Sequence, residues 1–166
     1  MAVTTFPSTP WWRIAVALIV VPLVASFAFA IYSPAYEGLP NMRERVIRTA
    51  VVVAFFGAYP PIVVLGIPLI FYLRGRVRAS LANCAIAGAS VATFPWLCLI
   101  VFFGPDEAWT NDHITYHNGM MTLWGLLEAV ELLAEIAVFG IAAGALFWLI
   151  AASGLKNRPP LKKVFE

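Results

Sequence analysis

Four long stretches without a charged residue constrain this chain more than any other feature of its sequence. They cover residues 14–36, 49–73, 79–105 and 136–155, and the shortest of them has 20 residues. About 20 helical residues cross the ~30 Å hydrocarbon core of a bilayer, because each residue adds about 1.5 Å along the helix axis. The sequence therefore predicts four membrane-spanning helices.

The composition agrees with this prediction, since 61% of the residues are hydrophobic and only 12% are charged. Such a chain is not an ordinary soluble domain, a disordered segment, a nucleic-acid-binding protein or a disulfide-stapled secreted module. We expect an all-α fold, an integral membrane four-helix bundle that forms one domain over residues 1–155 and is followed by a cytoplasmic tail at 156–166. The expected spans are about 11–32, 49–73, 80–103 and 133–153.

The basic residues indicate the orientation of these spans. Eight of the eleven Lys and Arg residues lie in the N-terminal tail, the 74–78 connection and the C-terminal tail, and the other three lie in the first connection. Loops that are rich in Lys and Arg stay in the cytoplasm, so we expect both termini there. In an alternative interpretation the first stretch is a signal peptide cleaved after Ala28-Phe29-Ala30, although it is longer than the usual ~7–15-residue apolar core.

The expected second helix has a clear start and a disturbed middle. Asn41 and Glu44 have the spacing of a capping box, which predicts a helix beginning after Asn41. Tyr59-Pro60-Pro61 and Pro68 remove backbone N–H donors further along, so this helix must bend.

Small residues predict close helix contacts in the third and fourth spans. Gly140 and Gly144 are four residues apart, as are Gly88 and Ala92. This spacing lets helix backbones approach closely in membranes. We interpret it as packing inside one bundle, with a dedicated dimer face as the alternative.

Three glutamates form the strongest candidate site. Glu128, Glu131 and Glu135 lie at i, i+3 and i+7, which places them on one stripe of the fourth helix. One interpretation is an ion-pair cluster with arginines at the outer end of the second helix, namely Arg43, Arg45 and Arg48. The alternatives are a proton or cation path through the stripe and a surface that binds another subunit.

The third connection, residues 105–119, carries both histidines. His113 and His117 have the i, i+4 spacing that presents two imidazoles on one face of a helix, and Asp112 adds a carboxylate beside them. They are candidate ligands of a divalent metal on the outer side. The alternatives are exposed or hydrogen-bonded loop histidines and a pH-sensing pair.

Other chemistry has no residues to support it. The chain contains no G-x-S-x-G, Walker loop, H-E-x-x-H or paired Cys-x-x-Cys. We therefore expect no cofactor and no enzymatic activity.

Two segments carry a resemblance to other proteins. Val64-Leu65-Gly66-Ile67-Pro68-Leu69 with Leu73-Arg74-Gly75-Arg76, and Gly144-Ala145-Leu146-Phe147-Trp148-Leu149-Ile150, resemble segments of small four-helix inner-membrane proteins of bacteria. The resemblance implies a bacterial inner membrane and carries over no activity and no site residue.

Three classes of function remain. The leading one is a non-enzymatic accessory or interaction subunit of a membrane complex, because the spans hold few polar groups at mid-membrane depth. The second is a small oligomeric transporter or channel that uses the glutamate stripe for a proton or cation, and the third is an enzyme or metal-handling protein built on the outer histidines. The expected partners are the lipid bilayer, other membrane subunits or a second copy, and no nucleic acid.

Overall fold

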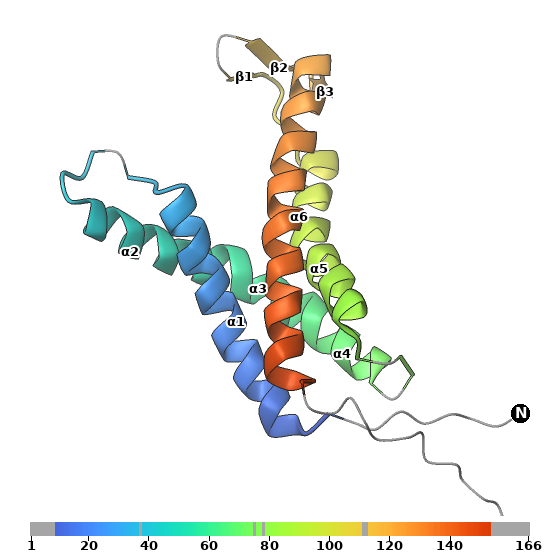
Figure 1. Ribbon diagram of the computed structural model, residues 1–166. Coiled ribbons are helices and arrows are strands. Elements are labelled where there is room, and N and C mark those ends of the chain that lie inside the picture. Colours follow the sequence, from blue (N-terminus) through green and yellow to red (C-terminus); the bar gives the residue numbers. More distant parts are fainter. Residues whose placement is uncertain (1–8, 37, 75, 78, 111–112, 154–166) are drawn as a thin grey trace, which may run out of the picture.

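A computed structural model describes residues 9–36, 38–74, 76–77, 79–110 and 113–153, and these are mostly helical. Four helices are long and apolar enough to cross a membrane (Figure 1). The first is α1 (Trp11–Tyr32), and the last two are α5 (Leu81–Phe102) and α6 (Leu123–Ala151). The second runs from Met42 to Leu73 and combines α2 (Met42–Val52), η1 (Val53–Ala58), α3 (Tyr59–Pro61), η2 (Ile62–Gly66) and α4 (Ile67–Leu73).

The second helix begins and bends as the sequence predicts. The Asn41 side chain caps it by accepting a hydrogen bond from the Arg43 backbone N–H. Two π-helical segments, η1 and η2, flank the Tyr59-Pro60-Pro61 turn, where wider i to i−5 bonding accommodates residues that cannot donate. The bent helix passes behind α1 and α6 in Figure 1.

Helices α5 and α6 form a tightly packed antiparallel pair. Gly88, Gly140 and Gly144 bring the two backbones together, because a Cβ at Gly140 would lie 2.8 Å from the Ala89 Cα and one at Gly144 would collide with the Cys84 carbonyl oxygen. The predicted packing of these glycines inside one chain is confirmed.

Helix α1 joins this pair near the end of α6. Ala17 and Val21 of α1 and Ala151 of α6 form a small buried core, which Phe147 and Ile150 help to cover. Arg13 closes the contact by donating a hydrogen bond to the Ser153 carbonyl. Towards its other end α1 leans away from α6, so the two helices form a V in Figure 1.

The connection between α5 and α6 corrects the all-α expectation, because it folds into a small antiparallel sheet. Its strands are β1 (Ala108–Thr110), β2 (His113–His117) and β3 (Met120–Met121), in the order β1-β2-β3. Asn118 and Gly119 both have positive φ, 52° and 72°, as a two-residue hairpin turn requires. The Asn-Gly signal therefore marks a hairpin, and α6 starts four residues later.

The ends of the helices lie on two sides of the molecule. The start of α1, the connection between α4 and α5, and the end of α6 lie together at the bottom of Figure 1. The hairpin and the connection between α1 and α2 lie on the opposite side. Most large apolar side chains point outward, and no residue of α5 is buried.

Candidate functional site

The glutamate stripe lies on the first half of α6. Glu128 and Glu135 are half-buried and Glu131 is exposed. Glu135 precedes Phe139 by about one turn, and the Phe139 ring contacts Phe29 and Tyr32 of α1. Because residues four apart share a helix face, the stripe lies towards the α1 side of α6, where the V opens.

The structure does not bring the arginines of α2 to this stripe. Arg48 pairs with Glu44 on its own helix at 2.6 Å, and this is the one ion pair within the described part of the chain. Arg45 donates hydrogen bonds to the carbonyls of Pro34 and Ala35, while Arg43 is exposed.

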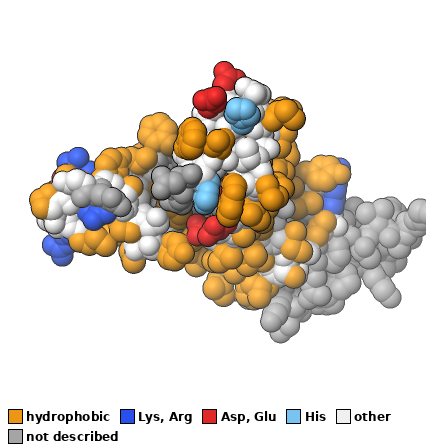
Figure 2. Space-filling view, turned by 90° about the horizontal axis from the view of Figure 1, so that it is seen from above, with side chains coloured by type: hydrophobic (Ala, Val, Ile, Leu, Met, Phe, Trp, Pro, Cys, Tyr) orange, Lys and Arg blue, Asp and Glu red, His pale blue; other side chains and the backbone are white. Residues whose placement is uncertain are grey.

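The direction of α2 explains this outcome. The π-helical segments and prolines send α2 outward past α1, away from α6 (Figure 1). Figure 2 shows the same separation, with basic side chains at the α2 end and acidic and histidine side chains over the hairpin.

The histidines lie on a strand and not on a helix, which corrects the expected geometry. Residues i and i+4 of a strand are about 13 Å apart along the chain, compared with about 6 Å in a helix. The His113 ring stacks on Trp124 of α6, with ring centroids 4.2 Å apart and an interplanar angle of 3°. Asp112 lies outside the described residues, and the described residues contain no group of three metal-ligand side chains. Metal binding by His113, His117 and Asp112 stays a prediction.

Hydrogen bonds hold strand β2 against the start of α6. The Thr122 side chain caps α6 by accepting from the Gly125 N–H, and its hydroxyl lies within hydrogen-bond distance of the Ile114 and Thr115 carbonyl oxygens. Gly125 allows this contact, since a Cβ there would collide with the Thr115 carbonyl oxygen. His113 and His117 therefore belong to a hairpin that is held against α6.

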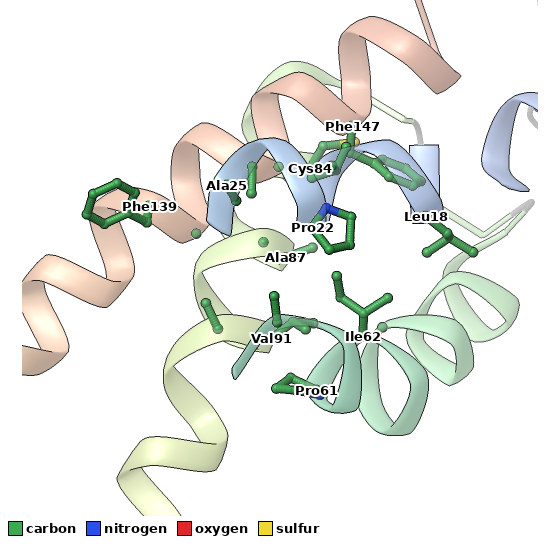
Figure 3. A pocket seen from close by; sticks show the side chains of 18 of the residues that line it. Leu18, Pro22, Ala25, Pro61, Ile62, Cys84, Ala87, Val91, Phe139 and Phe147 are labelled. Carbon is green, nitrogen blue, oxygen red and sulfur yellow. The ribbon is translucent and has the colours of Figure 1, made fainter. Parts of the chain in front are cut away.

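A long apolar cavity lies between the helices of the described structure. Its volume is about 590 Å³, and α1, the second helix, α5 and α6 all contribute to its wall. In Figure 3 the side chains of Pro22, Ile62 and Val91 surround one space, with Phe147 and Phe139 on the α6 side. The bends of the second helix keep it from packing closely on the α5–α6 pair, and the cavity lies in the space between them.

One end of the cavity is cationic. Arg74, at the C-terminal end of α4, is half-buried and lines the cavity. Its guanidinium lies 3.8 Å from the centre of a Trp11 ring and donates a hydrogen bond of 3.2 Å to the Thr9 carbonyl. The arrangement can hold an anionic group at the arginine and a hydrocarbon chain beyond it.

Sequence reasoning missed this cavity. The sequence indicates for Arg74 a role in membrane orientation and a contact with anionic lipid, and for the prolines a bend, but it does not indicate a cavity. Two features together could have indicated the cavity. They are an arginine at the end of a span and, within the same span, prolines that prevent close helix packing.

Comparisons with protein-family models, with curated proteins and with solved structures found no match to this chain.

Proposed function

We propose that the chain is an integral protein of a bacterial inner membrane, has both termini in the cytoplasm, and serves as a non-enzymatic interaction subunit of a membrane complex. Its four long apolar helices support membrane insertion. The start of α1, the end of α6 and the residues of the 74–78 connection that the structure describes, among them Arg74 and Arg76, lie on one side of the molecule, in agreement with cytoplasmic termini (Figure 1).

The observation that carries the interaction role is the arm formed by α2 and η1. One face of this arm is covered, since Thr49, Ala50 and Ala54 are buried where the arm packs along α1. A second, exposed face carries Ile47, Val51 and Phe55, which are 48%, 50% and 66% exposed. Because the arm extends beyond the rest of the molecule, this face can receive an apolar helix of another subunit.

A photo-crosslinking amino acid at Val51 tests this role in membranes of cells that make the protein. We expect a discrete crosslinked protein, identified by mass spectrometry, because the arm face contacts a partner subunit. Val101 of α5 is the matched control, since it is 62% exposed on a helix with no extended arm. Lipid adducts alone at both positions would contradict the interaction role.

The second candidate function is a small oligomeric transporter or channel that uses Glu128, Glu131 and Glu135. Counting ~20 residues back from Ala151 reaches Leu132, so Glu135 would lie just inside the hydrocarbon and Glu128 about 6 Å outside it. The stripe thus occupies one membrane edge. The cavity wall nearer the membrane centre is apolar, as Figure 3 shows for Pro22, Ile62 and Val91, and such a wall favours the interaction role over ion passage.

A further inference from the structure

The length of the cavity fits a hydrocarbon chain. Its lining residues on α1 extend from Ile14 to Phe29, which is about 22 Å along a helix and more than half of the ~30 Å hydrocarbon core. Its volume of about 590 Å³ lies within the ~300–1,000 Å³ of ligand pockets. A cavity of this shape in a membrane protein is filled by what surrounds it, which is the acyl chain of a lipid.

The apolar wall alone does not select one lipid over another. An acyl chain gains no hydrophobic free energy on leaving the bilayer for an apolar cavity, because both surroundings are hydrocarbon. Selection must come from the polar end, where Arg74 lines the cavity and Trp11 lies at the level preferred by interfacial aromatic rings.

Arg74 is suited to a phosphate. A guanidinium has five N–H donors in a planar fork that matches phosphate oxygens, and the described contacts use one of its nitrogens, for the Thr9 carbonyl. The Trp11 ring holds the guanidinium plane through a cation–π contact. Arg13 and Arg76 lie at the same end of the molecule, and the described acidic residues all lie on α2, in the hairpin connection or on the first half of α6.

We propose that this cavity is a binding site for an anionic phospholipid, with the phosphate on Arg74 and one acyl chain between α1, the second helix and the α5–α6 pair. This site depends on the proposed membrane insertion, but it does not depend on the proposed partner subunit at the α2–η1 arm. Loss of lipid binding and loss of the Val51 crosslink therefore refute separate proposals.

The test titrates dioleoyl phosphatidylglycerol and dioleoyl phosphatidylcholine into the full-length protein in detergent micelles, with bound lipid counted by native mass spectrometry. We expect phosphatidylglycerol to bind about fivefold more tightly, because the charge of its phosphate on Arg74 is not offset by a choline cation. Arg74→Gln should remove this preference and should weaken phosphatidylglycerol binding more than phosphatidylcholine binding. Inorganic phosphate at the same concentration should not compete, because the acyl chain is part of the recognition.

Arg76→Gln is the matched control. Arg76 lies two residues away, but its guanidinium is 4.5 Å from the centre of the Tyr72 ring and it does not line the cavity. This variant should keep the preference. An equal loss in Arg74→Gln and Arg76→Gln would overturn the site in favour of diffuse attraction to a basic surface.

Filling the cavity tests the position of the acyl chain. Val91→Phe and Ala87→Leu place added volume in the wall formed by α5, and either variant that keeps the helical circular dichroism of the parent should bind both lipids less tightly. Unchanged lipid binding in a folded variant would overturn the proposal. A dimer of the parent protein that is absent in these variants would also overturn it, because a second copy of the chain would then occupy the cavity.

Discussion

Gly144 is a single residue that sets the distance between two helices. A methyl group at this position would collide with the Cys84 carbonyl oxygen, which belongs to the backbone and cannot rotate away. Gly144→Ala should therefore force α5 and α6 apart and lower the free energy of unfolding by about 1–3 kcal/mol. Unfolding in mixed micelles titrated with sodium dodecyl sulfate measures this change.

Gly57→Ala is the control for that substitution. Gly57 also lies in a helical segment, but its added Cβ would be 3.7 Å from the Val53 Cγ1, an ordinary contact. The free energy of unfolding of Gly57→Ala should stay the same or rise, since alanine is a better helix former than glycine. Equal losses at both glycines would mean that the α5–α6 contact has no special role.

At the scale of elements, the strand β2 separates two residues that a helix would bring together. Its extended backbone spaces His113 and His117 by about 13 Å, and His113 is stacked on Trp124. We expect added Zn²⁺ or a chelator to leave the thermal midpoint unchanged, both in the parent and in the double variant His113→Ala with His117→Ala. Elemental analysis that finds about one zinc per chain, lost in the double variant, would restore the metal site.

The helices were predictable because their limits depend on local residues. Helix α1 has the expected bounds, 11–32, and α5 occupies 81–102 where 80–103 was expected. Prolines, a capping residue and the limits of the uncharged stretches are local features, and they locate these helix ends to within a few residues. Helix α6 begins ten residues before the expected span at 133, because its first turns are helical but amphipathic.

The candidate sites were harder to predict, because they depend on directions in space. The pairing of Arg48 with Glu135 required α2 to run beside α6, and the prolines that predict a bend do not specify its direction. The hairpin strands have two to five residues, too short for a clear period-two pattern. The cavity depends on four separate walls and leaves no local pattern in the sequence.

At the scale of the whole molecule, the orientation across the membrane can be measured. Reporter fusions at Val77 and after the last residue should both report the cytoplasm, because the basic residues gather on that side. A fusion at Thr110 in the hairpin connection should report the outer side. The reverse pattern would place Arg74, and the phosphate it binds, in the other leaflet.

The V between α1 and the α5–α6 pair determines the order in which the chain assembles. Helices α5 and α6 are neighbours in sequence and can pair as soon as both have entered the bilayer, because little loop entropy opposes them. Helix α1 can pack along α2 and η1, which follow it directly, whereas its contacts with α6 join residues as far apart as Arg13 and Ser153, 140 positions along the chain. The contact between α1 and α6 is therefore the last of these helix contacts that can form, and it closes the V only when synthesis of α6 is complete.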